Sequence, residues 1–251
     1  MEKNIKNDYI HYENILHDIR LPLTIMHTTM QLLVNMPLPN NAKEHIVVAL
    51  HSCYRMLKLL NDSDYIAKIE RGHLTPNLAN KNIVSIIKIL VENTHLLATK
   101  KNIKINLHKD TDKIIMAIDK FMLERILLNL LSNAIKFTPN GGNIDVTIKN
   151  HGDSISIIVK DDGPGVENKD IINNIFNRYT TSDNMQGTGI GLVIVDQLIK
   201  ALGGTIAAKN LNGAIFTATL PIHIVDKDEK QLMIDDFYKD NIVQIELSEH
   251  L

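Results

Sequence analysis

The stretch "YIHYENILHDIRLPLTIMHTTMQLL", residues 9–33, decides the fold of the first third of the chain. Its apolar side chains recur at alternating steps of three and four residues, which places them on one face of a helix. These positions are Tyr9, Tyr12, Leu16, Ile19, Leu23, Met26, Met30 and Leu33. The stretch therefore predicts one long helix with a single apolar seam, as found in helical bundles and coiled coils.

A second helix is predicted after a short break. The segment "NMPLPNNA" (35–42) carries Pro37 and Pro39, which end a helix. Beyond it, helical spacing resumes at Ile46, Leu50, Cys53, Leu57 and Leu60. The two stripes describe a helical hairpin, which buries little apolar surface alone. We therefore expect two copies of the chain to form a four-helix bundle, and hence a homodimer.

The composition excludes several classes of protein. The chain has 251 residues and a net charge of −2, so it has no basic excess that would favour nucleic acid as a partner. Its single cysteine cannot form an internal disulfide, which fits a reducing compartment. No apolar run is long enough for a transmembrane segment, and the N-terminus lacks a signal-peptide core. We expect a cytoplasmic chain.

A change of pattern marks a second domain. Gly72 and Pro76 interrupt "RGHLTPNLAN" (71–80), so we place the domains at 1–72 and 73–222. Helix-like and strand-like segments then interleave, including strands at 103–109 and 113–118, and a hairpin turning at 150–153. The fold class predicted for the whole chain is α+β, with the second domain an α/β sandwich: one mixed sheet covered by helices on one face.

The remaining residues, 223–251, form an acidic C-terminal tail. Within it, "VQIELS" (243–248) alternates apolar and polar residues like a strand. We expect no chemistry from this segment.

Three polar clusters in the second domain suggest nucleotide binding. In "NLLSNAIKFTPNGG" (129–142), Asn129, Asn133 and Lys136 share one helix face, where two amide oxygens suit Mg²⁺ bound with a nucleotide and the lysine suits a phosphate. In "DDGPGV" (161–166), a carboxylate at a strand end can accept a hydrogen bond from an adenine amino group. The alternatives are a solvated helix face and a plain surface turn.

The third cluster, "GTGIGL" (187–192), opens a helix, and a helix N-terminus favours phosphate. The polar stretch 167–186 before it, built around Phe176, is typical of a lid over a ligand, with Arg178 able to reach a terminal phosphate. An ordinary long loop is the alternative.

One further cluster lies in the first helix. The segment "HDIRLPLT" (17–24) places His17 and Asp18 just off the apolar seam, towards solvent. An exposed imidazole beside a carboxylate can serve as a nucleophile with its base or orienting group. The alternative is a surface histidine without chemistry, one of eleven histidines in the chain.

Taken together, these motifs resemble the catalytic core of a sensor histidine kinase. "HDIRLPLT" is similar to the family's phosphoacceptor box and "NLLSNAIKFTP" to its asparagine box. "DDGPGV", "IFNRY" and "GTGIGL" are similar to its first glycine, phenylalanine and second glycine boxes. All five occur in the family's order across about residues 5–222.

The resemblance implies a dimerisation and phosphotransfer hairpin followed by a Bergerat-type ATP-binding domain. His17 would attack the γ-phosphate of ATP, Asp18 would orient the imidazole or take its proton, and Mg²⁺ would be held by Asn129 and Asn133. The phosphoryl group would then pass to an aspartate in the receiver domain of a response regulator. The implied ATP-binding residues are Asn129, Asn133, Lys136, Phe137, Asp161, Gly163, Gly165, Arg178, Gly187, Thr188, Gly189, Gly191 and Leu192. The chain could equally be the cytoplasmic part of a longer sensor.

Three positions depart from the family pattern. Leu16 replaces the common serine before the histidine, and "TTSD" (180–183) replaces a common second arginine in the lid. Leu21 replaces a polar residue that the family ties to dephosphorylating the regulator, so we expect weak or absent phosphatase activity.

Two alternatives remain: a nucleotide-binding signalling scaffold without phosphotransfer, and another ATPase of the same fold, such as a protein-serine kinase or a chaperone-like ATPase.

Overall fold

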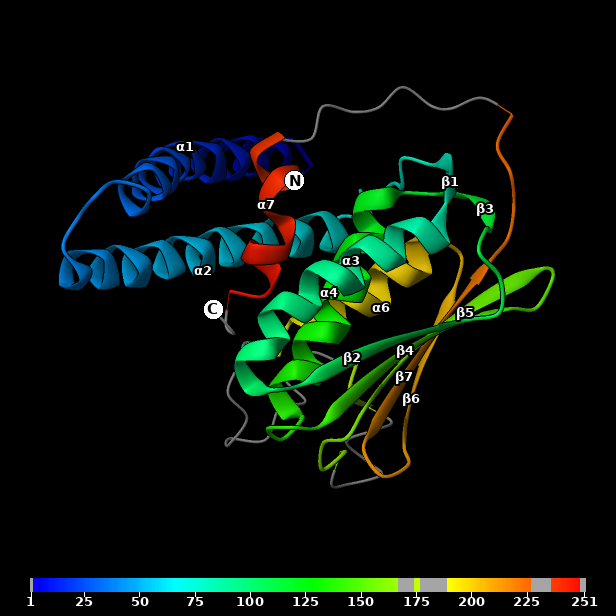
Figure 1. The fold of residues 1–251 in the computed structure, drawn as a ribbon. Coiled ribbons are helices and arrows are strands. Elements are labelled where there is room, and N and C mark those ends of the chain that lie inside the picture. Colours follow the sequence, from blue (N-terminus) through cyan, green and yellow to red (C-terminus); the bar gives the residue numbers. More distant parts are fainter. Residues whose placement is uncertain (1, 167–173, 177–188, 227–235, 249–251) are drawn as a thin grey trace.

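The computed structural model describes residues 2–166, 174–176, 189–226 and 236–248. Two long antiparallel helices, α1 (Glu2–Val34) and α2 (Asn40–Glu70), form the predicted hairpin beside a layered α/β unit (Figure 1). Helix α1 continues without a break through Pro22. Across the described ranges, no helix is both long and apolar enough to cross a membrane.

The apolar seam of the hairpin divides into two faces. Leu16, Leu23 and His27 are buried in the single chain, whereas Ile19 and Met26 are 42 % and 45 % exposed. On α2, the buried members of the predicted stripe are Cys53 and Leu57. The seam expected from the sequence therefore packs partly within the hairpin and partly remains on its surface.

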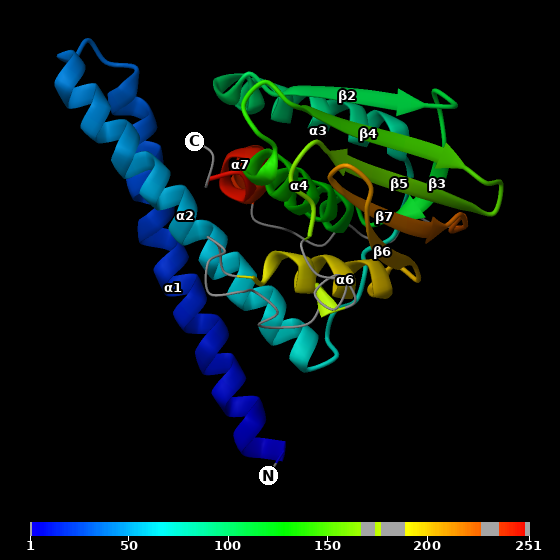
Figure 2. The same cartoon turned by 90° about the horizontal axis from the view of Figure 1, so that it is seen from below.

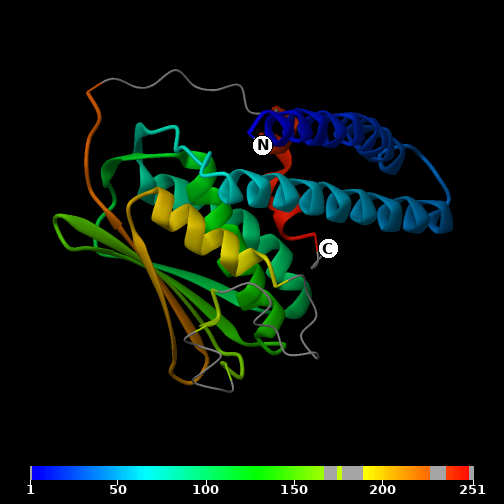
Figure 3. The ribbon, with the colours of Figure 1, turned by 180° about the vertical axis from the view of Figure 1, so that it is seen from behind.

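The second unit consists of strands with a helical layer on one face (Figures 1 and 3). The main sheet has the order β2-β4-β5-β7-β6; β2 and β4 are parallel and the other neighbours antiparallel, which confirms a mixed sheet. A separate pair, β1 and β3, is antiparallel. The strands are β1 (Ala79–Asn82), β2 (Lys104–Lys109), β3 (Ile115–Ile118), β4 (Asn143–Asn150), β5 (Ser154–Asp161), β6 (Thr205–Asn210) and β7 (Ala214–Pro221). The helices are α3 (Ile83–Ala98), the 3₁₀ turn η1 (Thr99–Lys101), α4 (Lys120–Phe137) and α6 (Gly191–Ala201).

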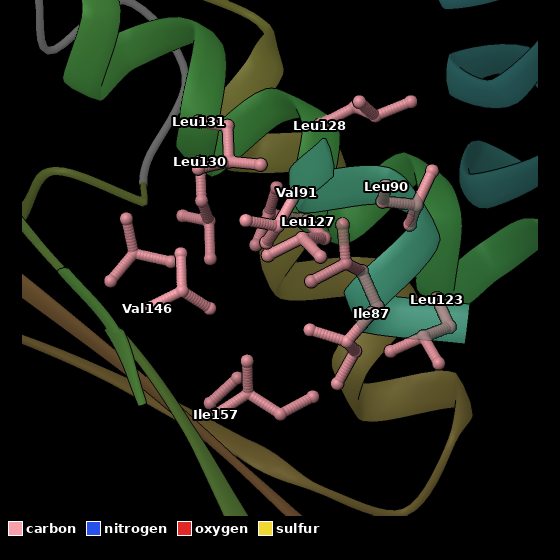
Figure 4. Packing of buried hydrophobic residues seen from close by; sticks show 14 of the residues in the cluster. Ile87, Leu90, Val91, Leu123, Leu127, Leu128, Leu130, Leu131, Val146 and Ile157 are labelled. Atoms are coloured by element: carbon pink, nitrogen blue, oxygen red, sulfur yellow. The ribbon is translucent and has the colours of Figure 1, made fainter. Parts of the chain in front are cut away.

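The core lies between this sheet and its helices. Figure 4 shows Ile87 of α3 and Leu127 of α4 packed over Val146 of β4 and Ile157 of β5, all of them buried. Aliphatic side chains supply this layer, as a chain without tryptophan requires. Their removal from water is the main favourable term that holds the sheet to the helices.

The connector between the two units is anchored at its far end. Asp119 caps α4, accepting hydrogen bonds from the backbone N–H groups of Phe121 (2.9 Å) and Met122 (3.1 Å). Its second carboxylate oxygen accepts from the N–H of Asn77 (2.9 Å), which lies between α2 and β1. One carboxylate therefore starts α4 and fixes the connector.

The C-terminal segment is a helix, α7 (Asp236–Glu246), and the strand expected at 243–248 is wrong. Figures 1 and 2 show α7 between the hairpin and the α/β unit. Ile242, Val243 and Leu247 join the core of that unit, while Ile245 joins the buried cluster of the hairpin. Part of the predicted acidic C-terminal tail is thus packed on two sides.

A fully buried cation links α2, α4 and α7. Arg125 of α4 forms ion pairs with Asp62 of α2 and with Glu246 of α7, the latter over 2.9 Å. Its guanidinium carbon lies 4.2 Å from the ring centroid of Tyr65. Removing one partner from a buried ion pair costs about 3–5 kcal/mol, because the other charge stays buried. These three helices therefore depend on one another.

We predict that His27 makes the hairpin sensitive to acid. Burial lowers the pKa of His27 below its usual 6.5, so the unfolded chain binds a proton more readily than the folded chain. Above pH 6.5 the ring is neutral in both states, and the fold keeps its full stability. As the pH falls from 6.5 towards the lowered pKa of the folded state, the unfolded chain takes up a proton and the fold loses stability. The melting temperature should fall between pH 7.5 and 5.5, and His27→Leu should reduce that fall.

The matched control is His45→Leu, which replaces an exposed histidine of α2 and should keep the wild-type pH dependence. Part of the decrease in melting temperature with falling pH should remain in His27→Leu, because burial, together with the charges of Lys100 and Arg55, also lowers the pKa of His51. Equal slopes for the wild type and His27→Leu would contradict this account.

Candidate functional site

The alternation of β5 carries a carboxylate to the helix-covered face of the sheet. Ile157 and Val159 are buried on this face, and Asp161, two residues further, follows the same alternation and is 3 % exposed. Asp161 pairs in register with Ile144 at the end of the strand. The sequence thus places an acid at the end of a row of apolar side chains, where water is largely excluded.

Backbone groups hold this carboxylate in place. The Asp161 Oδ1 accepts hydrogen bonds from the N–H groups of Gly163 (2.9 Å) and Ala214 (3.2 Å). A side chain at Gly213 would collide with this site, because a Cβ atom there would lie 1.8 Å from the Asp161 carbonyl oxygen. Burial raises the pKa of Asp161 above its usual 3.8, against the effect of the two backbone donors.

The side-chain oxygen of Asn129, on α4, lies close to the first residue of α6. The Asn129 Nδ2 donates to the Arg125 carbonyl oxygen (2.9 Å). The Asn129 Oδ1 is then directed at Gly191, where an added Cβ atom would lie 2.6 Å away. Gly191 begins α6, and within the described ranges no side chain caps this N-terminus. Uncapped N–H groups and the helix dipole attract an anion, so this end of α6 suits a phosphate.

Asn133 and Lys136 follow on the same face of α4, both half-buried. The Lys136 Nζ lies 5.2 Å from the ring centroid of Phe137, which is 37 % exposed. Leu192 of α6 packs against the core, and Gly189 lies just before the helix. The structure therefore places these predicted residues on α4 and around the start of α6.

The predicted lid is described only at 174–176. Phe176, the expected anchor, contacts Phe216 of β7 edge to face, with 6.4 Å between ring centroids. Arg178, Gly187 and Thr188, which the sequence analysis assigned to the nucleotide, lie outside the described residues.

Sequence reasoning missed the β6–β7 hairpin as part of the site. Asn210 accepts from the Val166 N–H (2.9 Å) through Oδ1 and donates to the Val166 carbonyl oxygen through Nδ2. Gly165 lies against the same side chain. Together with Gly213 and Ala214, Asn210 fixes the "DDGPGV" segment from a distant part of the chain. The Asn-Gly pair at 212–213 was a turn signal, but its contacts could not be inferred from it.

The histidine–carboxylate pair lies on the hairpin and is open to solvent. The side chains of His17 and Asp18 are 76 % and 83 % exposed, and 3.7 Å separates the His17 Nδ1 from the Asp18 Oδ1. That distance is longer than a hydrogen bond, and the two groups form an ion pair only when the imidazole is protonated. Leu21, one turn further along α1, is 58 % exposed. The imidazole is therefore accessible to a large reactant.

The donor set fits a magnesium ion carried by a nucleotide. The described residues contain no cluster of three or more histidine, cysteine or acidic side chains able to hold a metal. The directed Oδ1 of Asn129 and the amide of Asn133 are neutral oxygen ligands, which suit Mg²⁺ when phosphates supply the negative ones.

Two family descriptions match the chain, one on each side of the connector. The His Kinase A (phospho-acceptor) domain matches residues 13–72. The histidine kinase-, DNA gyrase B- and HSP90-like ATPase matches residues 118–224. The chain is a histidine kinase catalytic core.

Individual relatives agree with this assignment. Hybrid signal transduction histidine kinase D of Dictyostelium discoideum is 29 % identical over 224 residues, 84 % of this chain and 14 % of the relative. Sensor histidine kinase WalK of Bacillus subtilis (strain 168) is 27 % identical over 227 residues, 86 % of this chain and 37 % of the relative. The structure of full-length ShkA in complex with AMPPNP has a TM-score of 0.70 and 27 % identity, covering 86 % of this chain and 46 % of that one. The histidine kinase core thus spans less than half the length of these relatives.

We predict that Asp161→Asn weakens nucleotide binding without lowering the stability of this histidine kinase core. Loss of the charged acceptor should weaken ATP binding about 10- to 100-fold, since a hydrogen bond to a charged group contributes about 1.5–3 kcal/mol. The melting temperature without nucleotide should stay equal or rise at pH 7. Because the pKa of Asp161 is raised in the folded state, ionisation of this carboxyl destabilises the fold as the pH increases from 3.8 through the raised value. Asparagine does not ionise and therefore avoids this loss of stability. Calorimetry measures both quantities.

The control is Asp162→Asn. The exposed Asp162 carboxylate accepts from the backbone and side chain of Asn143 (both 2.9 Å), away from the buried face. This variant should bind ATP like the wild type. ATP affinity in Asp161→Asn equal to that of the control would contradict the proposed role of Asp161.

Proposed function

We propose that the chain is an ATP-dependent protein-histidine kinase that phosphorylates His17 and passes the phosphoryl group to an aspartate of a response-regulator receiver domain. The observation that carries the proposal is the joint presence, in the same chain, of an open imidazole on α1 and of an α/β unit with a buried carboxylate on β5 and an uncapped N-terminus on α6.

The geometry of the α/β unit supports binding of a nucleotide whose base and phosphates contact two separate places. The carboxylate of Asp161 is held by backbone donors through Oδ1, which leaves Oδ2 to accept from an adenine amino group. The N-terminus of α6, beside the Asn129 Oδ1, is suited to the phosphates. The AMPPNP complex of ShkA, a relative of the same fold, is consistent with this assignment.

The hairpin supports the acceptor chemistry. Asp18 lies beside the Nδ1 of His17, so the Nε2 is the ring nitrogen turned towards a reactant. With the ring proton on Nδ1, the Nε2 lone pair forms the new P–N bond as the bond from the γ-phosphorus to the bridging oxygen of ADP breaks. Asp18 then stabilises the positive ring and accepts its Nδ1 proton.

Magnesium and positioning supply the rest of the catalysis in this proposal. Mg²⁺ bound by Asn129 and Asn133 would neutralise phosphate charge, and Lys136 would donate to a phosphate oxygen. Arg178 would reach the terminal phosphate, and Gly163, Gly165, Gly187 and Gly189 would shape the pocket. Thr188 remains one of the implied ATP-binding residues.

Exposed apolar side chains support the proposed homodimer. Nine large apolar residues within helices α1 and α2 are at least 40 % exposed in the single chain, and a second hairpin would cover part of this surface. They are Ile15, Ile19, Leu21, Ile25, Met26, Leu32, Val48, Met56 and Leu59.

We predict that His17→Gln abolishes phosphorylation while ATP still binds. The wild type, incubated with Mg²⁺ and γ-labelled ATP, should yield an acid-labile, base-stable phosphoprotein. His45→Gln, which replaces another exposed histidine of the hairpin, should label normally. Label that persists in His17→Gln would point to another acceptor. A wild type that binds ATP without labelling would favour the signalling scaffold.

We also predict that Leu21→Thr introduces phosphatase activity. Leu21 is exposed one turn from His17 and cannot hydrogen-bond a water, whereas threonine can position one for attack on the phosphoryl-aspartate of the regulator. The rate of regulator dephosphorylation should rise about tenfold or more above the wild type. Leu21→Val is the matched control, because valine has the shape of threonine without the hydroxyl. A wild type already active as a phosphatase, with no gain in Leu21→Thr, would contradict the expectation.

A further inference from the structure

Helix α7 lies outside both regions matched by the family descriptions, 13–72 and 118–224, yet residues 242–248 at its C-terminal end are largely buried. Of residues 242–248, Gln244 is the one whose side chain is exposed. The surface that covers them, here named the α7-binding surface, consists of Leu23, Tyr54, Leu57, Lys58 and Asp62 of the hairpin and Arg125 of α4.

Apolar contacts reach α7 from both structural units. On the hairpin side, Ile245 packs in one buried cluster with Leu23, Tyr54 and Leu57. On the other side, Ile242 and Val243 belong to the core beneath α3 and α4. Because one helix contributes to both clusters, its presence holds the two units against each other (Figures 1 and 2).

Polar groups make this contact specific. Glu246, in the last turn of α7, pairs with the fully buried Arg125, which also pairs with Asp62 of the hairpin. The Lys58 Nζ donates to the Glu246 carbonyl oxygen (2.8 Å), placing a cation at the C-terminal end of α7, where the helix dipole favours it. The surface thus recognises a helix with apolar side chains on two faces and a carboxylate in its last turn.

The docked arrangement leaves the phosphoacceptor uncovered. The His17 side chain is 76 % exposed, and its charged contact within the described residues is with Asp18 of the same helix. For its Nε2 to meet a γ-phosphate held near Asn129 and the start of α6, an ATP-binding unit has to cover it. Arg125 of α4 is paired with Asp62 of α2 and Glu246 of α7, so any movement that shifts α4 relative to α2 has to disrupt this cluster.

We propose that the α7-binding surface is a regulatory site for an acidic helix, that its occupant here is the chain's own segment 236–248, and that occupancy restrains phosphorylation of His17. Release of α7 frees the ATP-binding unit to reach the histidine. The inference rests on the proposed kinase activity, and α7 acts on that activity through domain position rather than through contact with substrate.

The test weakens α7 docking from each side in the whole 251-residue chain. Glu246→Gln removes the charge on α7 but keeps its shape, and Lys58→Met removes the hairpin's contact with its end. Two controls match them. Gln244→Ala alters the exposed face of α7, and Lys68→Met removes an α2 lysine that pairs with Asp64 instead (2.7 Å). Each variant is assayed for the initial rate of His17 phosphorylation, KM for ATP, and hydrogen exchange of the α7 amides.

The proposal expects faster exchange in α7 and about tenfold faster phosphorylation in Glu246→Gln, in the range usual for coupling between two sites. Lys58→Met should change both in the same direction, and the double variant further, with KM for ATP and exchange in the sheet unchanged. Gln244→Ala and Lys68→Met should behave as the wild type. Unchanged KM and sheet exchange distinguish release from partial unfolding.

Three results would overturn the proposal. Phosphorylation that is unchanged or slower while α7 exchanges faster means that α7 does not restrain the kinase. Exchange that is unchanged even in the double variant means that these contacts do not hold α7. A gain in rate with a changed KM places the effect at the nucleotide. Failure of the kinase function itself looks different: no variant, the wild type included, would label His17 although ATP binds.

Discussion

The arrangement of this chain depends on a guanidinium that has no access to water. Arg125 is 0 % exposed, and a charge so placed persists only when it is paired and hydrogen-bonded. Its two carboxylates come from helices on either side of it, one 63 residues before and one 121 residues after it in the chain. Hairpin, central helix and C-terminal helix are joined at this point. The backbone carbonyl of the same residue also orients Asn129, so this ion-pair cluster and the side chain proposed to bind the nucleotide lie one helical turn apart.

Those parts of the structure that local periodicity controls could be predicted from the sequence. The hairpin follows from steps of three and four, with breaks at Pro37 and Pro39, and the β4–β5 pair follows from alternation around a turn. The position of Asp161 on the buried face is a consequence of the same alternation, since residues two apart in a strand share a face. The start of α6 at Gly191 could also be predicted, because the glycine-rich segment "GTGIGL" indicates the beginning of a helix.

The parts that depend on long-range pairing could not be predicted in this way. In "VQIELS", the alternation of apolar and polar residues predicts a strand, but Glu246 is buried against Arg125, and no local pattern indicates such a partner. His27 lies outside the predicted apolar seam, yet it is fully buried against the ring of Tyr54 (4.7 Å between centroids). The side-chain bonds of Asn210 to Val166 join residues 44 apart, and no spacing rule indicates them.

The hydrogen bond between Asp119 and the Asn77 N–H has a consequence for how far the ATP-binding unit can travel. It leaves residues 71–76 as the connection between α2 and that unit, a segment of about 20 Å when fully extended. A nucleotide confined within such a radius meets an acceptor on the bundle at an effective concentration in roughly the millimolar range or above. In the proposed mechanism, encounter between the two is therefore frequent at any dilution of the protein, and the waiting time before transfer would be set by departure from the docked position rather than by search.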